Sequence, residues 1–581
     1  MIRPWDHWFS EGKRWAQVVV KQVNRVVDSL SFARAPDAPE PIPSPVARPR
    51  VAGVLDLFSQ SCLDRSCALI SPRPRDYRRV LSATSLDFLL AESAFAGNGG
   101  SWRYRLEWFV PHLGNELEGM IRLCQRRGIP TVFWNKDDPV HFERFVESAR
   151  LFDFVFTTDA LCIPSYRERL GHARVFALPF AAQPALHHPI LEGKRAQNVC
   201  FAGSYWNDRY AHRRREIDVL LGPALDFGLH IYDRNFDLRG LRARKWRFPE
   251  AYRPAIQGKL HYRKMVEAYK HYQVFLNVNS VPSSPTMFSR RVFELMACGT
   301  PVVSAWARGI EDVLGTDAVL FSSSEAETRQ HLERLLEDDD FWARRSLLGI
   351  RKVMGEHTYA SRLRAVCAQI GIDPPEGKQT RVALLARVRD EGEVRGLVAS
   401  LQRQRIQPQA VFLLVEPDRL SACSALAAQA ATLGHWKILP WGRASDPQAL
   451  LSALRKDSEW VWIYKPGNYY GSHYLEDYLL ATRYADRPVL GKHAHFRQKG
   501  DGTLALTGQG TEHCHVARVP SASAFLQSAA LDRGLLTKLW NAEWLSLEPD
   551  GCLALDRFHF VRGTRGEGVL PEEGFLKQVE C

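Results

Sequence analysis

Short apolar runs alternate with helix-length polar segments over residues 50–185. The runs are VAGVLDLFS, LDFLLAES, IPTVFWN, DFVFTTD and RVFALPF. Continuous apolar runs of this length are typical of strands in a parallel sheet that helices cover on both faces. The pattern therefore predicts a first α/β domain here.

The same rhythm returns over residues 186–373. Its strand candidates are NVCFAGSY, GLHIYD, QVFLNVNS, TPVVSA and AVLFSS. This repetition predicts a second α/β domain, with the chain crossing between the two near residues 181–197. Ligands of open α/β sheets bind beyond the carboxyl ends of the strands, so the polar residues at those ends are the candidate site.

In the first domain the segment NKDDPVHF follows a predicted strand and supplies Asp137, Asp138 and His141. A carboxylate or an imidazole there is placed to contact a substrate hydroxyl or to accept its proton. The alternative for the two aspartates is helix capping before Pro139. A single histidine such as His141 is more often structural.

In the second domain the stretch PTMFSRRVFELMACGTPVVS combines a short helix with a buried strand. Apolar residues fall at helical spacing from Phe288 to Met296, and Gly299 stands where that helix should stop. Thr286 and Ser289 are the candidate N-caps, which would leave free N–H groups at the positive end of the helix dipole. A helix start of this kind binds anions such as a diphosphate.

Arg290 and Glu294 lie four residues apart and share one face of the predicted helix. A cation for phosphate and a carboxylate for sugar hydroxyls are what a nucleotide-sugar pocket needs. The alternative is an ordinary ion pair on a solvated helix face.

Further candidates for the same pocket surround this helix. Gly203 and Ser204 end a strand where the backbone can approach a phosphate closely. Arg209 and Arg213 share the face of a following helix and are candidates to clamp a diphosphate. Asn277 and Asn279 end another strand, where they would contact a sugar or a base.

SRRVFELMACGTPVVS resembles the segment of GT-B glycosyltransferases that binds the sugar donor. With NVCFAGSYWNDRY and VFWNKDDPVHF it resembles, over about residues 50–370, the bacterial spore-maturation-protein type. The resemblance implies two Rossmann-like domains and a nucleotide sugar as co-substrate, with Glu294 holding the ribose. It implies a glycan or protein acceptor in bacterial surface-polysaccharide or glycoprotein synthesis. We expect no other cofactor and no metal.

A third α/β unit is predicted over residues 378–581. It opens with TRVALLARVRDEGEVRGLVASLQRQRIQPQAVFLLVE and resembles a family-2 glycosyltransferase of GT-A fold. Where that family carries acidic residues for a metal, this chain has Lys465 and Asn468. Hard divalent cations need carboxylate oxygens, so the unit is expected to lack the metal site. The nearby acids Glu476 and Asp477 are predicted to lie on a helix surface.

Residues 1–34 read as an amphipathic helix with tryptophans and basic residues interleaved, and residues 35–49 as a Pro-rich linker. A basic aromatic helix lies on a membrane surface or docks on protein, and both readings stay open. No run approaches the length of a membrane span, and the 11 cysteines show no pairing pattern. A cytoplasmic protein is expected, and the membrane alternative for residues 1–34 would place it peripherally at the inner face of the membrane.

The length of 581 residues suggests about three or four domains. A net charge of +12 calls for an anionic partner or a solvated basic surface. Nucleic acid is disfavoured because no recognisable binding module accompanies the charge. Two alternatives to a GT-B transferase remain: a bifunctional enzyme in which both halves work, and a non-catalytic glycan-binding scaffold.

Overall fold

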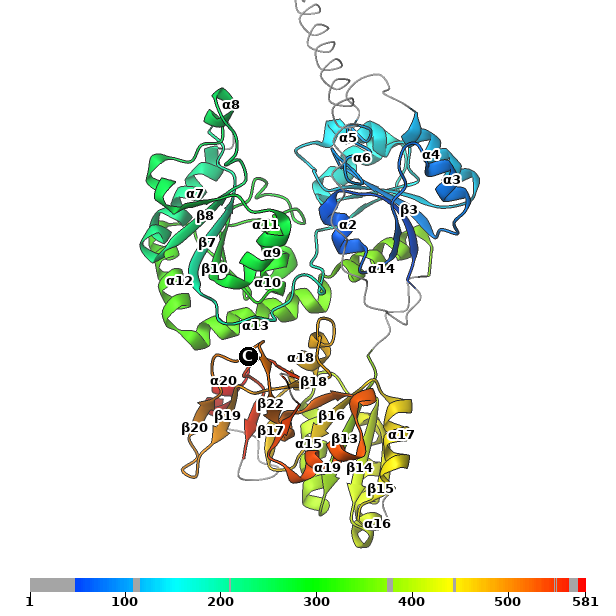
Figure 1. Cartoon of the computed structure of the whole chain (residues 1–581), viewed down its shortest axis with the longest axis vertical. Coiled ribbons are helices and arrows are strands. Elements are labelled where there is room, and N and C mark those ends of the chain that lie inside the picture. Colours follow the sequence, from blue (N-terminus) through cyan, green and yellow to red (C-terminus); the bar gives the residue numbers. More distant parts are fainter. Residues whose placement is uncertain are drawn as a thin grey trace, which may run out of the picture. The chain divides into compact units, whose positions relative to one another are not determined.

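The computed structural model describes most of the chain and divides it into two compact units (Figure 1). The first unit comprises residues 1–180 and 362–376, and the second comprises 181–361 and 377–581. The described residues are 48–107, 115–207, 211–373, 380–442, 446–547, 549, 551–563 and 573–581. The predicted N-terminal helix, nearly all of the Pro-rich linker and Arg209 lie outside them.

The first unit is built on a six-stranded parallel sheet in the order β2-β1-β3-β4-β5-β6. Its strands are β1 (Arg50–Val54), β2 (Ala68–Ile70), β3 (Phe88–Glu92), β4 (Thr131–Asn135), β5 (Phe154–Thr157) and β6 (Val175–Ala177). Its helices are α2 (Leu57–Leu63), α3 (Tyr77–Ser82), α4 (Glu116–Arg126), α5 (Phe142–Ala149) and α6 (Ile163–Leu170), with most of α14 (Tyr359–Ile370). Leu89, Phe133 and Val155 place this sheet in the core.

In the second unit, the central domain (residues 181–361) holds another six-stranded parallel sheet, in the order β12-β11-β10-β7-β8-β9. Its strands are β7 (Gln197–Gly203), β8 (Leu229–Asp233), β9 (Ile256–Gly258), β10 (Tyr272–Asn277), β11 (Val302–Ser304) and β12 (Val319–Phe321). Its helices are α7 (Ala211–Ala224), α8 (Leu241–Arg244), α9 (Tyr262–His271), α10 (Arg291–Ala297), α11 (Arg308–Leu314), α12 (Glu325–Glu337) and α13 (Asp339–Glu356).

The C-terminal domain (residues 377–581) is α/β as well, with an eight-stranded mixed sheet in the order β15-β14-β13-β16-β23-β18-β25-β21. Parallel strands β13 (Val382–Val388), β14 (Ala410–Val415), β15 (His435–Pro440) and β16 (Trp460–Tyr464) form one half. The remaining strands of that sheet are β18 (Val489–Gly491), β21 (His515–Val516), β23 (Phe525–Gln527) and β25 (Cys552–Ala554). The predicted fold class, two Rossmann-like sheets followed by a further α/β domain, is confirmed.

Two smaller sheets and six helices complete the described part of this domain. Strands β17 (Asn468–Tyr470), β26 (Phe560–Arg562), β19 (His495–Gln498) and β20 (Leu504–Thr507) form one sheet, and β22 (Arg518–Pro520) pairs with β24 (Trp544–Ser546). The helices are α15 (Glu391–Arg403), α16 (Leu420–Gln429), α17 (Pro447–Asp457), α18 (Tyr474–Ala481), α19 (Arg533–Asn541) and α20 (Glu573–Val579).

Helix α13 joins the central domain to the C-terminal domain. Its Leu347 packs in an apolar cluster with Phe558, and its Arg351 donates to both oxygens of Asp477 at 2.7 and 2.9 Å. Lys492 is fully buried and lies 2.8 Å from each oxygen of Asp556. The prediction that Asp477 lies on a helix surface is therefore wrong, because α18 packs its charged face against α13.

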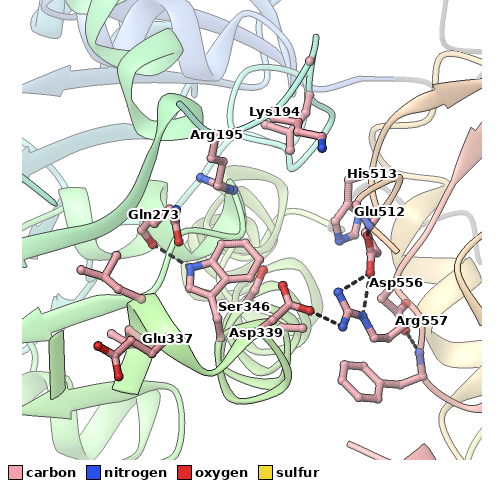
Figure 2. Close-up of a pocket in the computed structure, with 18 residues that line it drawn as sticks. Lys194, Arg195, Gln273, Glu337, Asp339, Ser346, Glu512, His513, Asp556 and Arg557 are labelled. Carbon is pink, nitrogen blue, oxygen red and sulfur yellow. Dashed lines mark hydrogen bonds and ion pairs between the residues drawn. The ribbon is translucent and has the colours of Figure 1, made fainter. Parts of the chain in front are cut away.

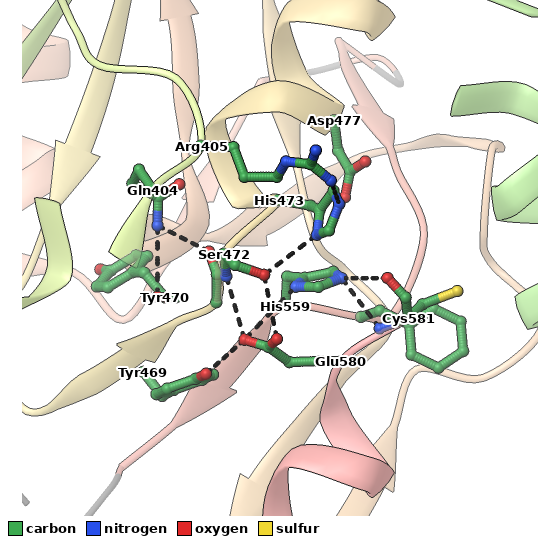
Figure 3. A network of polar contacts seen from close by, with 12 residues as sticks. Gln404, Arg405, Tyr469, Tyr470, Ser472, His473, Asp477, His559, Glu580 and Cys581 are labelled. Carbon is green, nitrogen blue, oxygen red and sulfur yellow. Dashed lines mark hydrogen bonds and ion pairs between the residues drawn. The ribbon is translucent and has the colours of Figure 1, made fainter. Parts of the chain in front are cut away.

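The C-terminal segment is tied to the same domain by a polar network (Figure 3). Glu580 accepts hydrogen bonds from the Tyr469 hydroxyl at 2.5 Å and from the amide and hydroxyl of Ser472, each at 3.1 Å. The amide of Cys581 donates to His559 Nε2 at 3.1 Å. These contacts hold α20 beside β17 and β26, so this segment is part of the folded domain.

Candidate functional site

Glu294 lies in the first turn of α10, at the centre of a cluster of polar side chains in the central domain. Its side chain is fully buried, and its two oxygens accept bonds from Arg290 Nε at 3.1 Å and from the Tyr269 hydroxyl at 2.7 Å. Arg290 is the half-exposed partner, with 37% of its side chain accessible. The two residues share a helix face, as predicted, and they form the ion pair that the alternative named. The alternative is wrong in placing that pair on a solvated face, because the carboxylate is inside the protein.

The charge on Glu294 is stabilised despite its burial. Burial raises the pKa of Glu294, but the charge of Arg290 and the hydrogen bond from Tyr269 outweigh it, so the pKa falls below its ordinary value. The site therefore holds an ionised carboxylate at neutral pH. A buried carboxylate with two partners keeps acceptor capacity for ligand hydroxyls, which reach it only when a covering side chain moves.

Sequence reasoning missed three residues of this cluster, His187, Tyr262 and Tyr269. Burial lowers the pKa of His187 to about 4, so the ring is neutral. The Gln183 amide donates to its Nδ1, which leaves Nε2–H to donate to the Tyr262 hydroxyl at 2.8 Å. No local pattern signals these residues, since they lie on the segment before β7 and on α9.

The predicted anion site at the start of this helix is not formed as expected. Helix α10 begins at Arg291 with Arg290 as its N-cap, and no side chain caps it. The amide of Thr286 donates to Ser284 Oγ at 3.3 Å, and that of Ser289 donates to Asn279 Oδ1 at 3.3 Å. The expectation that Thr286 and Ser289 cap the helix and leave free amides is therefore wrong, because the loop uses these amides itself.

Asn277 and Asn279 serve the same loop. Both are buried, and Asn277 Nδ2 donates to Ser304 Oγ at 3.0 Å across the ends of β10 and β11. Asn279 accepts the Ser289 amide and so fixes the approach to α10. In the described structure their polar groups position the loop around Glu294, and direct contact with a ligand stays a prediction.

Gly203 and Ser204 lie at the end of β7, as predicted. Arg213 on α7 is buried and donates to the Ser204 carbonyl at 2.7 Å, while Arg291 donates to the Ala202 carbonyl at 2.5 Å. Two guanidinium groups therefore hold the end of this strand from both sides. The two guanidinium groups create positive potential at Gly203 and Ser204, the predicted phosphate position.

In the first unit, Asp138 lies inside the protein and Asp137 lies at the sheet edge. Asp138 accepts bonds from Asn135 Nδ2 at 2.7 Å and Thr157 Oγ1 at 2.6 Å, and Asp137 accepts from Ser93 Oγ at 2.8 Å. Neither caps α5, whose N-cap is His141 without a side-chain bond. The capping alternative is therefore wrong.

His141 packs its ring edge-on against Phe95, with 5.5 Å between the ring centroids. This contact places the imidazole beside the loop that follows β3. Direct contact of His141 with a substrate stays a prediction.

Asp138 should make the first unit less stable as the pH rises. Burial raises the pKa of Asp138 to about 7, from 3.8 for a free carboxyl, although the Thr157 and Tyr166 hydrogen bonds lower it. Between those values the folded protein binds more protons than the unfolded chain, so stability falls as pH rises through this window. In Asp138→Asn, melting temperatures should lose this part of the pH dependence, whereas exposed Asp64→Asn should keep it. An unchanged profile in Asp138→Asn would contradict the assignment.

A buried lysine at this edge was missed by the sequence analysis. Lys136 Nζ lies 2.6 Å from Asp56 Oδ2, 2.9 Å from Glu92 Oε1 and 3.0 Å from Ser59 Oγ. Burial, with the charge of Asp56, raises the pKa of Glu92 to about 7 against the effect of Lys136. The sequence does show that Asp56, Glu92 and Lys136 stand at the ends of three predicted strands. It does not show that the three side chains pair, because that pairing is a tertiary contact.

Residues 213–368 match a family model described as glycosyl transferase-like. This segment is a glycosyltransferase domain. It contains Glu294 and most of the residues that surround it, namely Tyr262, Tyr269, Asn277, Asn279 and Arg290. The buried carboxylate cluster therefore lies within the matched segment.

Several solved glycosyltransferases resemble about half of the chain. Sucrose-phosphate synthase from Thermosynechococcus elongatus is 13% identical over 52% of this chain and 79% of its own, with a TM-score of 0.33. A glycosyltransferase from Rickettsia africae is 9% identical over 55% and 96%, with a TM-score of 0.37. Anabaena HepE, solved with UDP and glucose, is 12% identical over 55% and 91%, with a TM-score of 0.36. No curated protein matched the sequence.

In the C-terminal domain, Lys465 directly follows β16. Its Nζ donates to Ser521 Oγ at 2.7 Å and to the Ala542 carbonyl at 3.3 Å, and burial lowers its pKa to about 8. Asn468 Nδ2 donates to the Lys465 carbonyl at 3.0 Å and closes the turn. Within the described residues no three acidic, histidine or cysteine side chains gather as metal ligands, and no helix is both long and apolar enough to cross a membrane.

Proposed function

We propose that this glycosyltransferase moves a sugar from a nucleotide-sugar donor to a glycan or protein acceptor. The observation that carries the proposal is the ionised, buried Glu294 inside the matched segment. The resemblance to the spore-maturation type supports a role in bacterial surface-polysaccharide or glycoprotein synthesis, and any membrane contact would be made through residues 1–34.

On this proposal Glu294 accepts the ribose hydroxyls, and Arg290 turns from Glu294 toward the diphosphate when the sugar donor binds. The leaving diphosphate gains charge as the sugar–phosphate bond breaks, and nearby cations stabilise it. Arg213 and Arg291 supply part of that potential from the end of β7, next to Gly203 and Ser204. Arg209, which lies outside the described residues, stays a candidate for the same role.

The acceptor-side base is proposed to be Asp137, because Asp138 is fully buried and already accepts two bonds. Replacing a general base typically lowers turnover by about a hundredfold or more. Asp137→Asn should therefore lose turnover and keep its affinity for the sugar donor, measured by steady-state kinetics and ligand titration. Full turnover in Asp137→Asn, beside an equally active Asp64→Asn control, would refute the assignment.

A screen of nucleotide sugars for thermal stabilisation tests the function itself. A ligand that binds only the native state raises the apparent stability by about 2.7 kcal/mol at a hundred times its dissociation constant. We expect one nucleotide sugar to raise the melting temperature, and to do so equally in chelator and in manganese. Stabilisation that appears only with manganese would show a metal-dependent site, and no stabilisation by any nucleotide sugar would contradict the proposal.

For the C-terminal domain, whose sequence resembles a family-2 GT-A transferase, we propose a non-catalytic role. Lys465 in place of an acid supports this, since a cation there repels a divalent metal. The buried Arg351–Asp477 pair, which joins the domain to α13, supports a fixed position beside the central domain. The bifunctional alternative predicts transfer by this domain that survives Glu294→Gln.

A further inference from the structure

A cavity of about 240 Å³ lies between the central and C-terminal domains (Figure 2). Its central-domain wall includes Arg195, just before β7, and Gln273 at the start of β10. Neither Glu294 nor the residues grouped with it, Arg290, Tyr269, Tyr262 and His187, line this cavity, so it is separate from the proposed sugar-donor site.

A fixed indole ring forms one side of the cavity. Trp342 on α13 donates from Nε1 to the Gln273 carbonyl at 2.8 Å, and the Arg195 guanidinium lies 5.1 Å from its ring centroid. Arg195 is itself held by bonds to the Tyr272 carbonyl and Thr300 Oγ1, both at 2.8 Å. The aromatic surface is therefore in place before any ligand arrives, which lowers the entropic cost of binding.

Paired charges form the other side. Arg557 is buried and contacts Glu512 Oε1 of its own domain and Asp339 Oδ2 of the central domain, each at 2.5 Å. Asp556, which also lines the cavity, is paired with Lys492. The remaining lining charges, Lys194, Arg195 and Glu337, are mixed in sign. A cavity so balanced does not favour a phosphate or another anion, yet its carboxylates keep free lone pairs for hydroxyl groups.

The loop that carries the far wall is pinned in an uncommon conformation. His513 has a left-handed φ of 59°, which costs free energy in a non-glycine residue. Its carbonyl accepts the Leu191 amide at 2.9 Å, so the loops of the two domains are joined at the cavity mouth. His513 Nδ1 has no hydrogen-bond partner among the described residues. A strained backbone conformation of this kind persists only where the surrounding structure fixes it, and such conformations cluster at binding sites.

We propose that this cavity binds an uncharged saccharide unit. A sugar ring has an apolar C–H face, which suits the Trp342 indole, and a rim of hydroxyl groups, which suits the carboxylates of Asp339 and Glu512. A flat apolar surface with a few convergent polar groups is the usual build of a small-molecule site. If the proposed function holds, the saccharide belongs to the glycan being extended, kept on the enzyme between transfers.

Saturation-transfer NMR on the full chain without nucleotide tests this directly, with neutral hexoses, N-acetylhexosamines and a short hexose oligomer as probes. We expect a saturation-transfer signal for at least one probe. In Trp342→Ala, which loses the stacking surface, the dissociation constant of that probe should rise about tenfold. Trp306→Ala is the matched control, because Trp306 is 48% exposed on the same domain and outside the cavity. Since Trp342→Ala also loses its bond to Gln273, Ala343→Leu provides a second test that fills the cavity, with melting curves to verify the fold.

A weaker saturation-transfer signal in Trp342→Ala and Ala343→Leu, with an unchanged signal in Trp306→Ala, supports the saccharide site. The proposal would be overturned by any of three results: no saturation-transfer signal for any probe, an unchanged signal in both cavity variants, or displacement of the sugar by inorganic phosphate. Glu294→Gln separates the two sites, because it should weaken nucleotide binding and leave the saccharide signal intact. A signal lost in Glu294→Gln would place the sugar in the sugar-donor pocket instead. The saccharide result stands or falls without any measurement of transferase activity.

Discussion

Glu294→Gln is expected to lose transferase activity while the protein stays folded. The glutamine keeps an acceptor for the Tyr269 hydroxyl but removes the charge that holds Arg290 and would hold the ribose. Losing a charged hydrogen bond to the ligand costs about 1.5–3 kcal/mol, or about ten- to a hundredfold in affinity for the sugar donor. Isothermal titration with the stabilising nucleotide sugar measures this, and turnover should fall at least as far.

Glu333→Gln is the control, since Glu333 is an exposed carboxylate on α12 in the same domain. It should bind and turn over as the unchanged protein does. Melting curves distinguish a lost ligand contact from lost structure, because the half-exposed Arg290 can turn to solvent when its partner is neutral. Near-normal affinity and turnover in folded Glu294→Gln would remove Glu294 from the site.

Lys492→Met should cause the largest loss of stability among these variants. Lys492 is fully buried between Asp556, at 2.8 Å, and Asp477, at 3.6 Å. Removing one partner of a buried ion pair leaves an uncompensated charge and typically costs about 3–5 kcal/mol. Chemical denaturation should report this loss in the second unit, where the pair lies behind the contact between α13 and α18.

Two further variants make that test specific. Lys499→Met changes an exposed lysine of the same domain and should leave stability nearly unchanged. The double variant Lys492→Met with Asp556→Asn should regain part of the loss, because the orphaned carboxylate is neutralised while its bond from the Phe558 amide is kept. A Lys492→Met protein as stable as the unchanged chain would show that the pair contributes nothing.

The local pattern of apolar residues was enough to predict the strands and their burial in parallel sheets. Runs such as TVFWN in β4 and VFLN in β10 are buried throughout, because a strand covered on both faces has no solvent side to mark with polar residues. Gly299 does adopt a left-handed φ of 67° where the helix stops. These features depend on neighbouring residues, and the sequence displays them directly.

The sequence by itself therefore determined the three α/β sheets, the end of α10 and the pairing of Arg290 with Glu294. Only the tertiary structure decided which polar groups are buried and what they contact. Arg351 and Asp477 are 126 positions apart, and Lys136 meets Asp56 across 80. Thr286 and Ser289 do not cap α10, because the helix begins at Arg291, and their amides are bonded to the side chains of Ser284 and Asn279. Burial and hydrogen-bond partners depend on how distant segments pack, and no local period in the chain records that.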